Sequence, residues 1–325
     1  MKNLKKLLSV GKKRLFRKEE LLENVAKTFI QTEGVRRAWS ASTNTNYKVL
    51  LKHYKSYAIR TTIEDVDKKW IDGFVTHLHD KEGLRNSTIY MLLQEQRAIL
   101  RWAMAEGYKI NAEAVHYCPR LKSVNIRSNV LALTTDELQK LHDTHFESKS
   151  LKISRDIFLF CCYTSLRFSD VKRLKWADIT DGWINIVTQK TNDSLHIPLN
   201  TDASRIVMDY RRHNYTEKRC CVFQTMSCVN YNVNIKKVAR IAGLNRMVNK
   251  TWFKGAERME TSKPLHEVIS SHVGRKTFVT LALSSGMPAD VLCSITGHKD
   301  SRLLKHYYDI SREEQRKWVL HLCDK

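Results

Sequence analysis

The sequence lacks the features that would place the protein in a membrane or in the secretory pathway. No apolar run approaches the roughly 20 residues that a membrane-spanning helix needs. The uncharged stretch near the start, Leu7–Gly11, is too short for the apolar region of a signal peptide. We therefore expect an intracellular, cytoplasmic protein that has no membrane partner.

The sequence does not indicate disulfide bonds, a metal site or a cofactor either. The eight cysteines include adjacent pairs, Cys161-Cys162 and Cys220-Cys221, but no C-x-x-C spacing, which argues against a disulfide framework and against a zinc site. There is no glycine-rich phosphate loop and no cluster of carboxylates that would suit magnesium. We expect reduced thiols, no metal and no cofactor.

Acidic residues are few relative to basic ones. The 325 residues include 56 Lys and Arg against 34 Asp and Glu, which gives a formal net charge of +22 and a pI near 9.7. The excess is +12 over residues 1–130 and +10 over the remainder, so it is not confined to a tail. This balance indicates a polyanionic partner, with nucleic acid as the first candidate. Charge alone would also fit a generic cationic surface.

The length favours two domains over one. Residues 1–20 carry eight basic and two acidic side chains and predict a tail that is solvated, in contact with DNA, or disordered. Residues 21–112 show helical periodicity, residues 113–131 show little and are the predicted linker, and residues 132–325 form the second domain. The linker carries two basic side chains that we expect to contact DNA: Arg120 and Lys122.

Three helices are predicted in the first domain. One begins at a cap on Asn44 or Thr45, and two more follow Asp67 and Ser87, with Gly107 suited to a left-handed stop after the last. The face opposite the apolar stripe of the first helix carries three lysines that we expect to contact DNA: Lys48, Lys52 and Lys55.

The second domain is predicted to be mostly helical with one small hairpin. Thr134 and Glu137 have the spacing of a capping box at the start of its first helix. The runs Trp183–Gln189 and Ser194–Leu199 read as two short strands. A basic helix over Asn230–Ile241 follows, and the remainder is expected to be mostly helical.

Six side chains of the second domain suit phosphate transfer when they are taken together. In chain order they are Arg167, Lys190, His272, Arg275, His298 and Tyr307. Arginines, a lysine and histidines can hold a dispersed oxyanion, and a tyrosine can attack a phosphodiester. Each alone has an ordinary explanation, as a surface ion pair, a solvated turn residue or a core aromatic.

Local spacing favours particular pairs within this set. Arg167 and Asp170 stand three residues apart, so on a helix the carboxylate can steady the guanidinium. Lys190 lies at the tip of the predicted hairpin, where it can reach DNA, and Lys175 is the alternative. His272 and Arg275 also share a helical face, and one of the two serines before them, at 270 or 271, can cap that helix.

The order of these residues, and the segments around them, resemble the tyrosine recombinases, also called the phage integrase family. The matching segments are Tyr163–Val171, Leu265–Thr280 and Ile295–Asp300, the last resembling the family's Leu-Gly-His segment. Nine residues beyond His298, Tyr307 occupies the position of the family's nucleophile, and its neighbour Tyr308 is the rival.

The sequence also departs from the family pattern. Ser165 stands where the family commonly has glycine, and Asp170 where it commonly has glutamate. Gly274 and Lys276 replace the leucine and the second histidine of the usual His-x-Leu-Arg-His. None of these changes removes one of the six side chains.

The resemblance implies a mainly helical, two-domain fold, with a helical core-binding domain followed by a catalytic domain that carries a small β-sheet or hairpin. It implies that Tyr307 forms a 3′-phosphotyrosyl bond, while Arg167, Arg275 and His298 hold the non-bridging oxygens. Lys190 would protonate the leaving 5′ oxygen, His272 would help to accept the tyrosine proton, and Asp170 would support the site.

The resemblance also implies the partners and the outcome of the reaction. Double-stranded DNA is the substrate, a homotetramer works on two recombination sites, and the amphipathic segment Ser311–Leu322 packs on a neighbouring subunit. Integration, excision and inversion are not separated, although the absence of an evident arm-binding domain favours a DNA invertase or a small-element integrase. A type IB topoisomerase and a non-catalytic DNA-binding regulator of the same fold are the alternatives.

Overall fold

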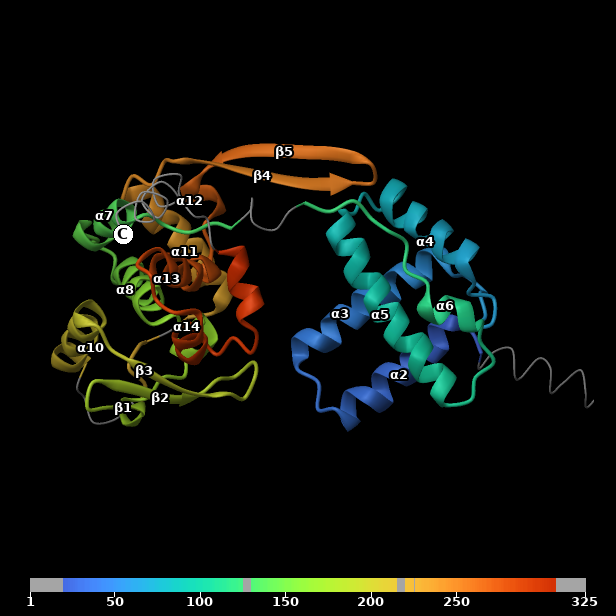
Figure 1. Ribbon diagram of the computed structural model, residues 1–325, viewed down its shortest axis with the longest axis horizontal. Helices are drawn as coiled ribbons and strands as arrows, with labels where there is room; N and C mark the ends of the chain where they lie inside the picture. Colours follow the sequence, from blue (N-terminus) through green and yellow to red (C-terminus); the bar gives the residue numbers. More distant parts are fainter. Residues whose placement is uncertain (1–19, 125–129, 215–219, 225, 308–325) are drawn as a thin grey trace, which may run out of the picture. The chain divides into compact units, whose positions relative to one another are not determined.

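A computed structural model describes residues 20–124, 130–214, 220–224 and 226–307, and it divides the chain into two compact units. The first unit comprises the residues up to Val124 together with Thr251–Glu260, and the second comprises the others. The structure confirms a mainly helical, two-domain architecture with small sheets (Figure 1). The predicted basic tail, apart from Glu20, and the predicted C-terminal helix lie outside the described residues.

In the residues described from Glu20 onward, the first unit contains five helices. They are α2 (Leu22–Arg36), α3 (Ala41–Tyr57), α4 (Lys68–Asp80), α5 (Asn86–Ala105) and α6 (Ala112–His116) (Figure 1). Their apolar faces share one core, in which Phe29, Tyr54 and Phe74 are almost completely buried. Each such side chain stabilises the fold by about 1.5–3 kcal/mol relative to an exposed position. Packing of the helices around this core is therefore a main source of the unit's stability.

The predicted start of α3 was wrong. The helix is capped by Ser40, whose hydroxyl accepts the backbone N–H three residues on at 3.2 Å, and not by Asn44 or Thr45. The segment from Ser40 to Thr45 is rich in residues that cap helices well, so local preference does not choose among them. Trp39 stacks on Tyr47, with 4.6 Å between the ring centroids, and this contact favours the earlier start.

The later boundaries of the first unit follow the sequence more closely. Asp67 caps α4 as predicted, with its carboxylate accepting a backbone N–H at 2.7 Å. Gly107 has a φ of +82° and ends α5 in the left-handed conformation. Helix α6 falls within the expected linker at 113–131, and its Ala114 and Val115 are buried in the core of the unit. The region without regular packing is therefore shorter than expected.

A two-stranded hairpin that the sequence did not indicate contributes to the first unit. Strands β4 (Met247–Lys254) and β5 (Glu257–Pro264) occupy a region expected to be helical (Figure 1). At the tip, Gly255 donates its N–H to the amide oxygen of Asn86 at 2.7 Å and accepts from the amide nitrogen at 2.9 Å. The same nitrogen donates to the carbonyl of Lys122 at 3.0 Å. The buried Asn86 side chain therefore joins three segments.

The hairpin tip fits its surroundings closely. Gly255 has a φ of +57°, and a Cβ atom built there would lie 2.5 Å from Nε2 of His79, so a side chain at this position is disfavoured twice. Close by, the guanidinium of Arg85 lies 4.1 Å from the ring centroid of Trp252, a cation–π contact. These contacts explain why residues 251–260 belong to the first unit.

The second unit is built around α8. Its helices are α7 (Thr135–Asp143), α8 (Lys149–Thr164), α9 (Phe168–Val171), η2 (Trp176–Asp178), α10 (Thr201–Asn214), α11 (Cys228–Ile241), α12 (Leu265–Val268), α13 (Ser271–Ser284), α14 (Ala289–Thr296) and η3 (Ser301–His306). Helix α8 packs against α7, α10, α11 and α13. A Cβ atom at Gly274 of α13 would lie 2.9 Å from Cβ of Cys161 of α8. The glycine that replaces the family's leucine therefore lets the two helices approach closely.

A small antiparallel sheet lies beside these helices. It has the order β1 (Ile179–Thr180), β2 (Trp183–Val187) and β3 (Ser194–Pro198), and Ile184 pairs with Ile197. Strands β2 and β3 confirm the predicted hairpin, whereas β1 was not predicted.

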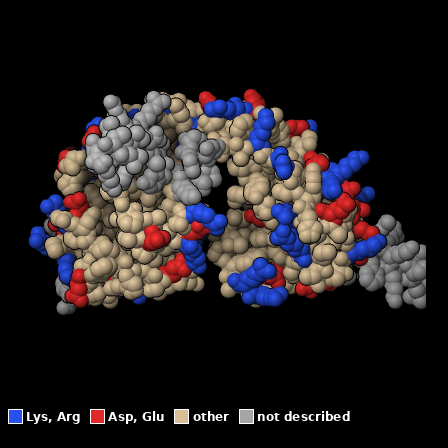
Figure 2. Space-filling model, viewed as in Figure 1, with Lys and Arg blue, Asp and Glu red and all other residues tan. Residues whose placement is uncertain are grey.

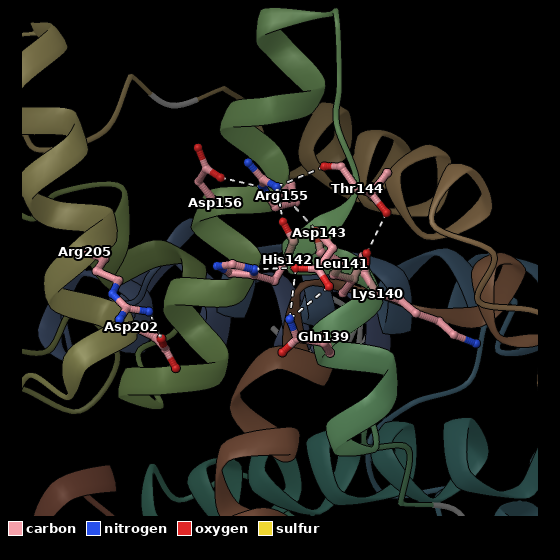
Figure 3. A network of polar contacts seen from close by, with 10 residues as sticks. All are labelled: Gln139, Lys140, Leu141, His142, Asp143, Thr144, Arg155, Asp156, Asp202 and Arg205. Carbon is pink, nitrogen blue, oxygen red and sulfur yellow. Dashed lines mark hydrogen bonds and ion pairs between the residues drawn. The ribbon is translucent and has the colours of Figure 1, made fainter.

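A polar network fixes the end of α7 on α8 (Figure 3). The guanidinium of Arg155 donates to the carbonyls of His142 and Thr144 at 2.9 and 3.1 Å and pairs with Asp156 at 2.6 Å. Asp156 in turn accepts the hydroxyl proton of Tyr210 at 3.1 Å. Because carbonyls at a helix end have no partner within the helix, Arg155 supplies the missing donors.

The start of α7 is fixed equally well. The predicted capping box is confirmed, since Thr134 accepts the N–H of Glu137 at 3.2 Å and the Glu137 carboxylate accepts that of Thr134 at 3.0 Å. Arg246 also donates two hydrogen bonds to Glu137, at 2.8 and 3.1 Å.

Candidate active site

Arg275 lies at the centre of the predicted set. It is buried on α13, with 5% of its surface exposed. Its guanidinium donates to the carbonyls of Ser165 at 3.0 Å and Thr296 at 2.6 Å, and it lies 3.3 Å from Nε2 of His298. Burial, and next the nearby charge of Arg167, lower the pKa of Arg275 to about 10, so it remains charged at neutral pH. One side chain therefore brings three distant sequence motifs together.

The turn that precedes Arg167 explains one departure from the family pattern. Ser165 caps the C-terminus of α8 with a φ of +60°, in the left-handed region that glycine adopts most easily. Its N–H donates to the carbonyl of Cys161 at 3.0 Å, and its own carbonyl accepts from Arg275. The serine therefore keeps the backbone shape that glycine would supply, at some conformational cost.

Asp170 links Arg167 to the strand hairpin. The carboxylate is almost fully buried and lies 4.0 Å from Arg167 and 3.9 Å from Arg173. Its other contact was not foreseen: Oδ1 accepts the backbone N–H of Gln189 at 2.9 Å. Since Gln189 directly precedes Lys190, one carboxylate orients both the arginine and the loop that carries the lysine.

Lys190 occupies the tip of that loop and is exposed. The loop is closed by hydrogen bonds from the N–H of Thr188 to the carbonyl of Asp193 at 2.9 Å and from the N–H of Asn192 to that of Thr188 at 3.1 Å. Lys175, the alternative, lies at the start of η2, where its backbone N–H donates to Asp178 at 2.8 Å. The loop position leaves the Lys190 ammonium free to reach a ligand.

His272 and Arg275 share the first turns of α13, as the sequence indicated. Ser270 occupies the N-cap position, as one of the two expected serines, but its side chain makes no capping hydrogen bond; the N–H of Ser271 donates to the side chain of Asn232 on α11 at 2.8 Å. The pKa of His272 is lowered, first by partial loss of water around the ring and then by positive charges, Lys276 first among them, with Arg275, Arg167 and Lys190 following. His272 is therefore neutral at pH 7 and able to accept a proton.

His298 is positioned by the end of α14. Gly297 has a φ of +69°, and a Cβ atom there would lie 3.1 Å from the side chain of Leu195, so glycine suits this turn. The ring of His298 lies 2.7 Å through Nδ1 from the hydroxyl of Thr296 and 3.3 Å through Nε2 from Arg275. Burial and the neighbouring arginines lower the pKa of His298 to about 4.

Tyr307 closes the set. It follows η3 and packs against a small apolar cluster that includes Val279, Leu292 and Leu304. Burial raises the pKa of its phenol, and the charge of Arg275 opposes that rise. The rival Tyr308 lies outside the described residues.

The arrangement gathers positive charge around one place. After burial, the charges of Arg275, Arg167 and Lys190 contribute to the lowered pKa of His272, and Arg167 contributes to that of Arg275, while Tyr307 lies near enough to Arg275 to interact with its charge. Such a cluster, with two of its side chains neutral and able to exchange protons, suits a phosphodiester whose charge grows during reaction.

Comparison with known families agrees with this geometry. The family described as the phage integrase family matches residues 132–314, and the phage integrase SAM-like domain matches residues 21–116. The chain belongs to the phage integrase family of tyrosine recombinases. A tyrosine recombinase XerC of Pediococcus pentosaceus is 21% identical over 290 residues, which cover 82% of this chain and 92% of that protein.

Solved structures share the fold of this recombinase. A lambda integrase (75–356) dimer bound to a COC′ core site has a TM-score of 0.66 and 19% identity, covering 88% of this chain and 95% of that one. A Tn1549 transposon integrase in complex with transposon right-end DNA has a TM-score of 0.67 and 14% identity, covering 93% and 99%. A lambda integrase tetramer bound to a Holliday junction has a TM-score of 0.65 and 18% identity, covering 90% and 77%.

The basic residues expected to contact DNA lie in the first unit of the recombinase. Lys48, Lys52 and Lys55 are exposed on α3, opposite the buried Leu50 and Tyr54. Figure 2 shows basic side chains on the surface of each unit, with acidic side chains scattered among them.

The two residues of the predicted linker that we expect to contact DNA, Arg120 and Lys122, are both exposed. Lys122 also donates to the carbonyl of Ala256 at the hairpin tip at 3.5 Å. Lys122 therefore has a structural partner as well as a charge that DNA can attract.

Other groups that could indicate a different chemistry are sparse. In the described ranges no three His, Cys, Asp or Glu side chains gather as a metal site would require. The seven cysteines that the structure describes are free thiols. No described helix is both long and apolar enough to cross a bilayer.

Proposed function

We propose that this recombinase breaks and rejoins DNA through Tyr307. The phenolic oxygen attacks a scissile phosphate, a 3′-phosphotyrosyl bond forms, and the bond to the 5′ oxygen breaks to leave a 5′ hydroxyl. A 5′ hydroxyl of the partner strand then attacks the phosphotyrosine and releases the tyrosine. Because the phosphodiester energy is kept in the covalent bond, the reaction needs neither nucleotide nor metal.

The observation that carries this proposal is the position of Arg275. Its contacts with Ser165, Thr296 and His298 place the Arg167 turn and the His298 turn beside the helix that bears His272. A planar guanidinium has five N–H donors, so donors remain for a phosphate after the two carbonyl bonds are made. Arg167, Arg275 and His298 would then hold the non-bridging oxygens.

Proton transfer follows from the protonation states. The Tyr307 phenol is a weak nucleophile because burial raises its pKa, so its proton must be accepted as it attacks. Neutral His272 suits that role, since burial and, after it, nearby cations keep its pKa low. Lys190, at the exposed tip of its loop, would protonate the leaving 5′ oxygen.

Two further features are part of the proposal. We propose a homotetramer acting on two double-stranded sites, in line with the lambda integrase tetramer that shares the fold. Integration, excision or inversion would depend on how the two sites are arranged, and we favour a DNA invertase or a mobile-element integrase. The contacts to the DNA backbone would include the lysines of α3.

The test is covalent capture on a nicked duplex made from the DNA that flanks the gene, with EDTA present and no nucleotide. The wild-type protein should form an adduct, and Tyr307→Phe should bind the duplex normally yet form none. Tyr308→Phe is the matched control and should react. An adduct with Tyr307→Phe, or a strict need for magnesium in cleavage, would contradict the proposal. Relaxation of supercoils without paired sites would favour a topoisomerase.

A further inference from the structure

Thr296, which was not among the predicted site residues, touches the proposed phosphate-binding histidine. It is fully buried as the last residue of α14, and it replaces the leucine of the family's Leu-Gly-His segment. Its hydroxyl lies 2.7 Å from the carbonyl oxygen of Leu292 and 2.7 Å from Nδ1 of His298. A buried hydroxyl with two such short contacts has a defined orientation.

The two contacts determine which ring nitrogen of His298 carries a proton. A hydroxyl has one proton to donate, and a carbonyl can only accept, so the Thr296 proton goes to Leu292. The Thr296 oxygen must then accept from Nδ1–H of His298. In the neutral ring Nε2 is therefore bare, which agrees with its position 3.3 Å from Arg275, a group that only donates.

This tautomer has a consequence for phosphate binding. A bare Nε2 cannot donate to a phosphate oxygen, so the ring must gain a proton there and become an imidazolium when the phosphate arrives. The charged and titratable groups around the ring are Arg275 and His272 of α13 and Arg167 before α9. The next residue, Lys299, is paired with Asp193 at 3.4 Å. Burial, Arg275, Arg167 and His272 all oppose protonation of the ring until an anion is present.

We propose that Thr296 is a positioning residue that fixes His298 as its Nδ1–H tautomer and, by keeping that hydrogen bond, stabilises the imidazolium that forms over the scissile phosphate. The proton is taken up from solvent at Nε2 and is donated as a hydrogen bond to a non-bridging oxygen. The stabilisation of the imidazolium over the phosphate rests on the proposed function, whereas the Nδ1–H tautomer of His298 is a property of the free protein.

The first experiment uses the free protein with ¹⁵N-labelled histidine, with His298→Gln to assign the signals. Wild type should show the Nδ1–H tautomer for His298, and Thr296→Ser, which keeps the hydroxyl, should show the same. Thr296→Val keeps the β-branched shape but removes the hydroxyl, and it should lose the preference for Nδ1–H. An Nε2–H tautomer in the wild-type protein would overturn the inference.

The second experiment measures single-turnover cleavage against pH on the nicked duplex. A hydrogen bond to a charged group is worth a roughly ten- to hundredfold effect. Thr296→Val should therefore cleave roughly ten- to hundredfold more slowly near pH 8. As the pH is raised, the cleavage rate of this variant should begin to fall at a lower pH than that of wild type, because its imidazolium loses the proton sooner. Thr296→Ser should match wild type. An unchanged pH profile in Thr296→Val would overturn the inference.

The two failures can be told apart. If the proposed function is wrong, Tyr307→Phe still forms an adduct, or His298→Gln cleaves like wild type, while the tautomer experiment still reports the Thr296 contact. If only the Thr296 inference is wrong, those two variants lose cleavage and Thr296→Val does not.

Discussion

Replacing Arg275 with alanine should cost both cleavage and stability, whereas replacing Arg167 should cost mainly cleavage. Under the proposed function each arginine supplies donors to the phosphate as charge develops. Loss of one such donor slows an enzyme by about 10²–10³-fold. The two alanine variants should therefore be similarly slow, and the difference between them should lie in their melting temperatures.

The size of that difference follows from the contacts. Arg275 donates to two carbonyls at helix ends, and a hydrogen bond that involves a charged group contributes about 1.5–3 kcal/mol. Burying the charge, and its repulsion by Arg167, offset part of this, which leaves a loss of about 3 kcal/mol. In a domain of this size class, about 2–4 °C is lost per kcal/mol, so the melting temperature should fall by about 6–12 °C.

In the described part of the chain, the side chain of Arg167 should contribute less to stability than that of Arg275. The ion pair that its side chain makes there is with Asp170, and the nearest atoms are 4.0 Å apart. The two groups are too far apart for a hydrogen bond, and the buried carboxylate keeps Arg173 at 3.9 Å and the N–H of Gln189 at 2.9 Å, so we expect the loss of Arg167 to cost about 1 kcal/mol. Arg167→Ala should therefore melt within about 4 °C of wild type.

The assay combines differential scanning calorimetry with single-turnover cleavage on saturating DNA, below the melting range of the weaker variant. Arg275→Lys is the matched control, since it keeps the charge but cannot reach both carbonyls with a planar fork. Equal melting shifts for the two alanine variants would refute the bridging role of Arg275. A loss of DNA affinity with normal cleavage would mean that Arg275 only anchors DNA, and the proposed site would have to be redrawn.

Three further predictions concern other parts of the molecule. Lys52→Ala should lower DNA affinity for all sequences and reduce the slope of log affinity against log salt by about one, with little change in the cleavage rate; a lowered rate at saturating DNA would refute a pure backbone contact. Asn86→Ala should leave the backbone N–H and C=O of Gly255 without their partner, so amide hydrogen exchange at the hairpin tip should quicken at least about tenfold. Unchanged exchange would show that contacts other than those of Asn86 hold the tip. The pKa of His298 is about 4, below that of the unfolded chain near 6.5, so the unfolded state binds the proton first and stability should fall as the pH drops from about 6.5 towards 4. His298→Gln should flatten that decline in calorimetry, and an equal decline in both proteins would contradict it.

The hairpin β4–β5 shows what pattern alone misses. Most of its side chains are exposed or partly exposed, so the strands lack the strict apolar alternation that identifies a half-buried strand. Its tip is fixed by Asn86, which lies 169 residues earlier. No local window of sequence contains both partners.

Sequence alone did not predict how α3 and α13 begin, for the related reason that several neighbouring residues could each serve as the cap. Ser40 and Asn44 are both good caps, and the stacking of Trp39 on Tyr47 favours the first. At α13 Ser270 is the N-cap residue but makes no capping hydrogen bond with its side chain, and Asn232 from another helix accepts the first backbone N–H of α13. In both places a tertiary contact decides between locally similar choices.

The sequence by itself determined the helical, two-domain architecture, the capping box at Thr134, the hairpin that carries Lys190, and the family, because these depend on periodicity, local spacing and the order of residue types. Only the tertiary structure decided how the site is held. The contacts of Arg275 with Ser165 and Thr296, and that of Asp170 with Gln189, join residues far apart in the chain. The lowered pKa values of His272 and His298 arise first from burial, and then from charges that include Arg167, which lies on a different element from both histidines; neither the burial nor that contact is contained in a local sequence pattern.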